Sequence, residues 1–344
     1  MPLLKTAHAP NRIRVLSGTP ATALVRDAVY IPVQPTLWYD KDDRYGLFHP
    51  DGTLIPESAY WWGPEENTTL GQSRTTIIPT EIDRVDEPLI YGGTIQHHYG
   101  HFLLSCFPRY AHRIRGARFL VHGRVSIDDW FSIKFVKTFF NAIGLDREDF
   151  VLFEKPTRIS NIVVPGTSLI ERLEAHTVFS DLLTEVSNKL LGEMSPSVNT
   201  KPLYLTKQHL TGALSNCRNE AEATEILARN GFDIVAPEQL SIPDQIRLFE
   251  DRSLVFGLMG SAFHTAALAR RSGKLVMISR ENLRSGQKEN YPLLDALRGL
   301  DTLYVHPDPE MIYLDPIPGF SSSYAMTDPK QFASDLTTIA SQLM

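Results

Sequence analysis

The second half of the chain alternates short apolar runs with longer stretches of helical periodicity, and this pattern constrains the fold more than any other feature. Five runs of strand length are separated by four helical stretches. The strand-like runs are PLYLT (202–206), FDIVAP (232–237), SLVFGLM (253–259), KLVMIS (274–279) and DTLYVH (301–306). This alternation predicts parallel strands with helices on both faces, a doubly wound α/β sheet.

Local signals support the helices in this half. Gly231 follows the last periodic residue of NEAEATEILARNG, as a C-terminal cap would. Ser241 and Asp244 form a capping pair at the start of IPDQIRLFEDR. We therefore expect helices that begin and end close to these residues.

The alternation begins earlier, at Pro88, and is preceded by a β-like region. In that region, AVYIPV (28–33) and RTTIIPT (74–80) are predicted strands. The later predicted strands are 88–93, 117–123, 150–154 and 161–166, and the predicted helices are 99–114, 128–144 and 176–192. The first half is therefore also predicted to contain a parallel sheet covered by helices.

A chain of 344 residues exceeds the size at which one core stops growing, so two domains are expected. The best linker candidate is EMSPSVNTKP (193–202), which has two prolines and small polar residues. We predict a β-rich region at 1–86, Rossmann-like domains at 87–195 and 196–325, and a final helix at 326–344 that packs back on the first domain.

Composition excludes several classes of protein. The net charge of −6 and the absence of a long Lys/Arg run argue against nucleic acid as a partner. Two cysteines are too few to cross-link the chain, and neither a secretory leader nor a membrane span is recognisable. We expect a cytoplasmic protein, with peripheral attachment to the inner membrane left open.

Several residues lie where parallel strands are predicted to end. Gly257 and Gly260 lead from a strand into a helix beginning near Ser261, a junction that favours a phosphate. Lys207 follows another strand, and Arg218 and Glu220 open the next helix. The alternative is that the glycine turn holds no ligand, that the cations are solvated and that Glu220 complements the helix dipole.

Histidines cluster in QHHYGHFLLSCFPRYAH (96–112). A helix beginning near Gly100 would place His101, Ser105, Pro108 and His112 on one face. His97, His98 and His101 lack carboxylate or cysteine partners at the spacing of a metal site, so no metal is expected. An imidazole could act as a base on a sugar hydroxyl, or could simply hydrogen-bond at a strand-to-helix turn.

In this order, the motifs resemble the family 61 glycosyltransferases, formerly a domain of unknown function, which includes capsular polysaccharide biosynthesis proteins. The resemblance runs from Gly92 to Val305 through GG, HYGHFLLSCFPRY, YLTKQ, RNEAEATEILARNGFDIVAPEQLSIPDQIRLFEDRSLVFGLMGSA, RRSGKLVMI and NYPLLDALRGLDTLYV. It implies a GT-B arrangement of two Rossmann-like domains facing across a cleft. It also implies inversion at the anomeric carbon, no cofactor and no required metal.

The resemblance also implies roles for particular residues. The donor, a nucleotide-sugar, would contact a set of residues in the second half, and the acceptor, a glycan or glycolipid, would lie near the histidines. The implied donor residues are Lys207, Arg218, Glu220, Gly257, Gly260, Ser261 and His264, and Ser105, His97 and Arg109 would line the acceptor cleft.

The sequence departs from the family pattern at important positions. The family has an acid four residues after its G-H histidine, where this chain has Ser105, and Met259 and His264 replace the usual His and Asn of the glycine turn. Lys207 stands where the family has Arg. We therefore expect His101 to be the catalytic base, with His98 as second choice. A non-catalytic nucleotide- or sugar-binding protein and a GT-B-like nucleotide-sugar epimerase remain alternatives.

Overall fold

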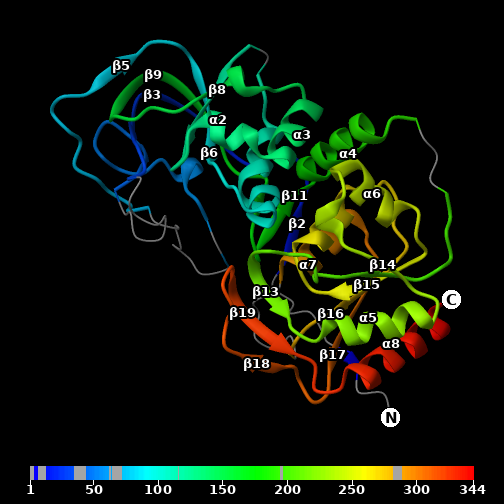
Figure 1. The fold of residues 1–344 in the computed structure, drawn as a ribbon. Coiled ribbons are helices and arrows are strands. Elements are labelled where there is room, and N and C mark those ends of the chain that lie inside the picture. Colours follow the sequence, from blue (N-terminus) through cyan, green and yellow to red (C-terminus); the bar gives the residue numbers. More distant parts are fainter. Residues whose placement is uncertain are drawn as a thin grey trace. The chain divides into compact units, whose positions relative to one another are not determined.

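The structure is a computed structural model, and it describes residues 4–6, 13–34, 44–61, 63, 72–114, 116–193, 197–281 and 289–344. The chain divides into two compact units (Figure 1). The N-terminal unit contains residues 12–189, and the C-terminal unit contains residues 1–11 and 190–344. Residues 12–86 thus share a unit with 87–189, whereas we expected a separate β-rich region.

The N-terminal unit is built on a sheet in the order β4-β3-β9-β6-β7-β8, with β5 also paired to β9. The strands are β3 (Thr22–Ile31), β4 (Gly46–Phe48), β5 (Asp83–Val85), β6 (Leu89–Thr94), β7 (Arg118–His122), β8 (Phe150–Val151) and β9 (Thr157–Pro165). Strands β9, β6, β7 and β8 are parallel neighbours, and the long β3 pairs antiparallel with β9. This β3–β9 pairing explains why the N-terminal segment does not form its own region.

The order of the parallel strands defines where a ligand would bind. Strands β6, β7 and β8 follow one another across the sheet, and β9, the next strand of this set along the chain, returns to the other side of β6. This is the strand order of one Rossmann half, and ligands bind at the carboxyl ends of the strands where the order reverses. In this unit, that switch point lies between β6 and β9.

The helices of this unit are less regular than their sequence predicts. They are α1 (Tyr99–His101), a π-helix (η2, Phe102–Cys106), a 3₁₀-helix (η3, Phe107–Ala111), α2 (Ile127–Ser132), α3 (Lys134–Ala142), η4 (Arg147–Asp149) and α4 (Thr177–Leu191), with η1 (Pro56–Ser58) further upstream. Pro108 has no N–H and interrupts the predicted helix over 99–114. Ile133 has extended backbone and splits the predicted helix over 128–144.

Two further differences concern strands. A small sheet joins β10 (Leu169–Ile170), β11 (Glu174–His176) and β2 (Arg14–Leu16) and was not predicted. The strand predicted at 74–80 is wrong, because that segment contributes only an isolated bridge between Thr53 and Thr75. Ile77 in this segment is 93% exposed, whereas Ile78 packs against the cluster of Val29, Ile31 and Phe48, so the segment covers part of the core without pairing into a sheet.

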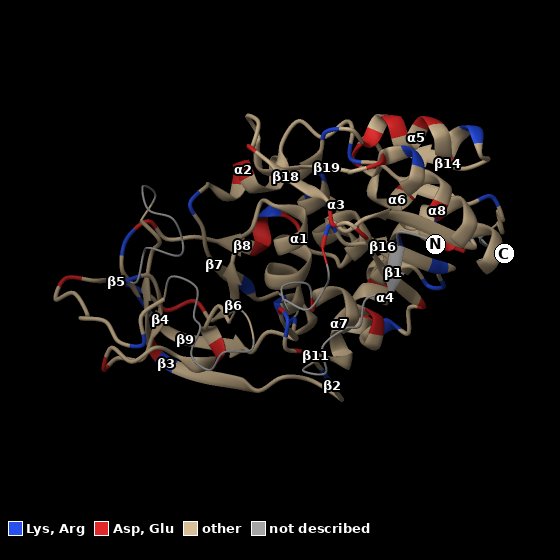
Figure 2. Ribbon diagram, turned by 90° about the horizontal axis from the view of Figure 1, so that it is seen from below, with Lys and Arg blue, Asp and Glu red and all other residues tan. Residues whose placement is uncertain are grey.

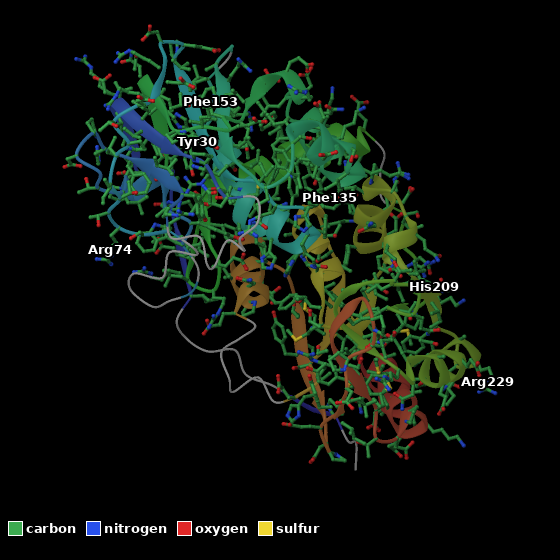
Figure 3. The ribbon with its side chains drawn as sticks, turned by 60° about the vertical axis from the view of Figure 1, so that its left-hand side comes forward. Tyr30, Arg74, Phe135, Phe153, His209 and Arg229 are labelled. Atoms are coloured by element: carbon green, nitrogen blue, oxygen red, sulfur yellow. The ribbon has the colours of Figure 1, made fainter. Side chains whose placement is uncertain are left out.

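Aromatic side chains fill the core of the N-terminal unit. His122 stacks on Tyr30 with ring centroids 4.2 Å apart, and Phe153 meets Tyr30 edge-on at 5.8 Å (Figure 3). The His122 ring bonds to the Tyr91 hydroxyl at 2.9 Å and to the Ile31 carbonyl at 3.0 Å, and burial lowers its pKa to about 3. His122 is therefore a neutral core residue.

The C-terminal unit is built on a sheet in the order β1-β17-β16-β15-β12-β14. Its strands are β1 (Leu4–Thr6), β12 (Leu203–Leu205), β14 (Asp233–Val235), β15 (Leu254–Leu258), β16 (Lys274–Ile278) and β17 (Thr302–Pro307). All five predicted strands are present and parallel, and β1 adds an antiparallel edge. The five parallel strands follow the flavodoxin-like 2-1-3-4-5 order, with the switch point between β12 and β15.

Helices cover both faces of this sheet. The elements are α5 (Glu220–Arg229), η5 (Pro237–Gln239), α6 (Ile242–Glu250), the 3₁₀-helix η6 (Ser261–Leu268), α7 (Asn290–Arg298) and α8 (Pro329–Leu343). Helices α5 and α8 lie side by side in one core with Phe256, and α6, η6 and α7 contribute to the other (Figure 1). Helix α8 therefore packs on α5 of its own unit, whereas we expected it to pack on the first domain.

The predicted caps of α5 and α6 are confirmed. Gly231, two residues past Arg229 at the end of α5, has φ 93°, a conformation that favours glycine. The Ser241 side chain accepts a hydrogen bond from the Asp244 N–H at the start of α6. The charges of α5 follow the helix dipole, with Glu220 and Glu222 in its first turn and Arg229 in its last (Figure 2).

A second sheet in this unit was not predicted. It joins β13 (Ala213–Cys217), β19 (Phe320–Ala325) and β18 (Ile312–Leu314), with β13 and β19 parallel (Figure 1).

Within the described part of the chain, no helix combines the length and apolarity that crossing a bilayer requires.

Candidate active site

The switch point of the C-terminal sheet brings together four of the predicted donor residues. Lys207 follows β12, and its ammonium donates to the Met259 carbonyl at 2.6 Å, just beyond β15. Gly257 lies in β15, and Gly260 directly follows Met259. Glu220 begins α5 and accepts a hydrogen bond from the Lys207 backbone N–H at 3.0 Å.

Glu220 supports the loop after β12. It is 1% exposed, and its second carboxylate oxygen accepts from the Tyr204 hydroxyl at 3.0 Å. Burial raises the pKa of this carboxyl, while the hydrogen bond from the Lys207 backbone and the Lys207 charge oppose the shift. Glu220 therefore holds the backbone of Lys207 in place.

A second cation lies at the same edge. Burial lowers the pKa of Lys207 to about 8, against the opposing charge of Glu220, and the positive charge of Arg280 lowers it further. Arg280 follows β16 as Lys207 follows β12, and its guanidinium carbon lies 3.9 Å from the centroid of the Tyr324 ring. Sequence reasoning missed Arg280, although the signal was the one that identified Lys207, a cation just past a strand.

The two glycines have different roles at this edge of the sheet. A β-carbon at Gly260 would lie 2.8 Å from both Cε and Nζ of Lys207. A β-carbon at Gly257 would lie 2.9 Å from the Leu205 carbonyl oxygen and 3.1 Å from the Phe263 ring. Gly260 thus gives the Lys207 ammonium its space, and Gly257 allows close packing between β15 and β12.

We expect Gly257→Ala to lower the free energy of unfolding by about 1–3 kcal/mol, because its β-carbon would push into fixed backbone. Gly260→Ala is the matched control, since there the new methyl group meets only the flexible end of Lys207. Urea unfolding of both variants measures the difference. Equal losses of stability in the two variants would contradict this assignment of the glycines.

The other three predicted donor residues have different surroundings. Ser261 is half-buried and begins η6, a 3₁₀-helix at the position where a helix was predicted. His264 is 8% exposed, with its ring centroid 4.9 Å from that of Tyr291. Arg218 is exposed at the end of β13, where its guanidinium donates to the Asp315 carbonyl.

A second polar cluster lies at the switch point of the N-terminal sheet, past the ends of β6 and β9. His101 Nδ1 lies 3.3 Å from a carboxylate oxygen of Glu171, and the Ser105 hydroxyl donates to the same oxygen. The ring centroids of His98 and His101 are 5.3 Å apart. The structure thus brings His98, His101 and Ser105 together with an acid that was not predicted.

The two histidines have opposite electrostatics. The hydrogen bond to Glu171 raises the pKa of His101, although partial burial opposes the shift. Burial and the neighbouring His101 and His97 lower the pKa of His98. The Nδ1 atom of His98 is buried and has no hydrogen-bond partner among the described residues. Of the two, His101 is the one whose ring nitrogen lies against a carboxylate.

Arg109 and His97, predicted to line the acceptor cleft, are not part of this cluster. Arg109 is 4% exposed, and its guanidinium donates to the carbonyls of Glu57, Ala59 and Pro165 at 2.6–2.8 Å. It therefore ties the segment around η1 to the end of β9. His97 is exposed at the end of β6.

Glu171 could not be found by motif spacing. It lies 70 residues beyond His101 in the chain, after a strand whose place beside β6 depends on the sheet order. The only available signal was general, a carboxylate a few residues past a predicted parallel strand. Within the described ranges, no group of three or more His, Cys, Asp or Glu side chains is placed to hold a metal ion.

These features define a class of protein: an α/β protein with polar side chains gathered at the switch point of each parallel sheet, as in enzymes that bind nucleotides. Residues 99–277 match the family described as Glycosyltransferase 61, and the chain belongs to that family. Membership indicates glycosyltransferase activity, with a nucleotide-sugar donor and a glycan acceptor in general terms. Among curated proteins, none matches the sequence.

Proposed function

We propose that the protein transfers a sugar from a nucleotide-sugar to a glycan or glycolipid by direct displacement, with inversion and without a metal. The assignment of the donor site rests on the carboxyl ends of β12, β15 and β16. There the Lys207 ammonium lies against the Met259 carbonyl, with Arg280 close enough to lower its pKa. Two cations at a switch point suit a diphosphate.

The displacement needs a base for the acceptor hydroxyl, and we propose His101. Its imidazole takes the hydroxyl proton as the oxygen attacks the anomeric carbon. The bond from that carbon to the diphosphate oxygen breaks, and its electron pair leaves with the nucleotide. Lys207 and Arg280 stabilise the charge that develops on the leaving group. The proposal includes a GT-B arrangement, because that arrangement would let the residues around Lys207 and those around His101 act on the same donor and acceptor.

Two alternatives give different products. A non-catalytic binding protein would bind a nucleotide-sugar and leave it unchanged. An epimerase would convert the donor to an isomer when no acceptor is present. Transfer to an added glycan, with release of a nucleoside diphosphate, would support the proposed function against both.

Donor binding is tested by a thermal-shift screen with UDP, GDP and their sugars. A ligand that binds the native state raises the melting temperature. We expect Lys207→Met to weaken binding of the active nucleotide about 10- to 100-fold, the loss expected for one hydrogen bond to a charged group. Lys201→Met is the control, because Lys201 is exposed and pairs with Asp233. Equal affinity in Lys207→Met and the wild type would remove Lys207 from the site.

The affinity for a nucleoside diphosphate should depend on pH through Lys207. The pKa of Lys207 is about 8, so its ammonium is present below that pH and is lost above it. Affinity is expected to fall about tenfold per pH unit above 8, because binding must first restore the proton. Lys207→Arg keeps its charge throughout this range and should remove the dependence. Calorimetric titration with UDP or GDP between pH 7 and 9.5 measures both.

A further inference from the structure

Glu171 is a buried carboxylate, and a buried carboxylate must be hydrogen-bonded or paired to remain charged. It is 4% exposed and lies in the turn between β10 and β11. Two of its polar partners come from a different element, the irregular helix after β6: the Ser105 hydroxyl, which donates to Glu171, and His101 Nδ1. The next residue, Arg172, has φ 67°, a strained conformation for a non-glycine residue of the kind found at functional sites.

The contact with Glu171 determines which nitrogen of the His101 ring carries the proton. An ionised carboxylate only accepts hydrogen bonds, so the Nδ1 atom facing Glu171 must carry the proton. The Nε2 atom of the neutral ring then has a free lone pair. The His101 side chain is 40% exposed, whereas that of Glu171 is 5% exposed. The imidazole, and not the carboxylate, is therefore the group that a substrate hydroxyl can reach.

We propose that Glu171 is the positioning residue of this active site, holding His101 in the Nδ1–H tautomer so that Nε2 can accept the proton of the acceptor hydroxyl. This inference rests on the proposed function. As the acceptor oxygen bonds to the anomeric carbon, its proton moves to Nε2 and the nucleoside diphosphate leaves with the electron pair. Glu171 stays ionised and stabilises the imidazolium.

The charged and titratable groups around His101 come from two segments of the chain. His97 and His98 precede it on the same segment, and Glu171 faces it from the β10–β11 turn. Burial lowers the pKa of His98, so His98 carries little charge at neutral pH. Glu171 is the group whose hydrogen bond and charge raise the pKa of His101. Removing the Glu171 charge should therefore lower the pKa of His101.

The first measurement needs no substrate. Histidine ¹⁵N NMR on the full chain reports the tautomer and pKa of each ring, and the His101 signal is identified by its loss in His101→Gln. In Glu171→Gln we expect a lower His101 pKa and loss of the pure Nδ1–H tautomer. Glu171→Asp should retain part of the effect. Glu174→Gln is the control, because that carboxylate pairs with Arg14 and should leave His101 unchanged. An unchanged His101 signal in folded Glu171→Gln would overturn the proposal.

The second measurement is kinetic, with the donor and acceptor found active for the wild type. Glu171→Gln is expected to lower kcat/KM about 100-fold or more, and to move the acidic limb of its pH profile to lower pH. The Ser105 hydroxyl donates to Glu171, so the carboxylate introduced by Ser105→Asp would reach the space that the Glu171 carboxylate occupies. We expect S105D/E171A to recover at least about tenfold over Glu171→Ala. A merely structural Glu171 would show neither the pH shift nor the recovery.

The two measurements separate the two hypotheses. If the NMR shifts appear but no nucleotide-sugar is ever turned over, the coupling between Glu171 and His101 stands and the proposed function fails. If the wild type transfers sugar while Glu171→Gln keeps its rate and pH profile, the function stands and the positioning role fails. Should Glu171→Gln not fold, Glu171→Asp and S105D/E171A carry the same comparison.

Discussion

His101→Ala is expected to lower the rate of sugar transfer about 10²- to 10⁴-fold, the contribution of a general base. Affinity for the nucleotide should stay nearly intact, because the donor residues we propose lie in the other unit of the chain. Transfer rates and calorimetric titration with the nucleotide measure the two quantities. The loss should appear mainly in kcat, since the proton moves only in the transition state.

His97→Ala is the matched control for this variant. His97 lies four residues earlier, is exposed, and belongs to the same histidine-rich segment. We expect its transfer rate to stay within a few-fold of wild type. Normal turnover in His101→Ala, or an equal loss in both variants, would remove His101 from the role of base.

Arg109→Met is expected to destabilise the N-terminal unit by about 3 kcal/mol or more. The substitution leaves three carbonyls, those of Glu57, Ala59 and Pro165, without the charged donor that they share. Hydrogen bonds to a charged group contribute about 1.5–3 kcal/mol each, and their effects are not fully additive. Chemical unfolding followed by tryptophan fluorescence measures the loss.

Arg113→Met provides the comparison. Arg113 donates to the Tyr110 carbonyl and pairs with Glu185, whose side chain is 44% exposed. Pairs of this kind contribute about 0–1 kcal/mol. A loss of stability in Arg109→Met no larger than that in Arg113→Met would mean that the three carbonyls find other donors.

The sheet of the C-terminal unit was predictable because its signals are local. Each parallel strand is a run of buried apolar residues such as Leu254–Leu258, and two connecting helices carry recognisable caps, Gly231 after α5 and Ser241 before α6. Period and capping are properties of a few neighbouring residues. The small sheet formed by β13, β18 and β19 escaped prediction because its strands are short and mostly half-buried or exposed.

The same distinction applies to the candidate site. Lys207, Gly257 and Gly260 could be found because each lies in or just after a recognisable strand. Arg280 obeyed the same rule and was overlooked. Glu171 could not have been paired with His101, because their contact depends on β9 lying beside β6. The structural role of Arg109 could not be predicted either, because its carbonyl partners lie 50 to 56 residues away in the chain.

The antiparallel pairing of β1 with β17 makes the C-terminal unit discontinuous, with residues from both ends of the chain. A fragment beginning at residue 190 would therefore leave the outer N–H and C=O groups of β17 unpaired. Open edges of this kind invite association with other chains. To study donor binding in isolation, residues 1–11 should be rejoined through a short linker after Met344, so that the missing strand is supplied by the same molecule.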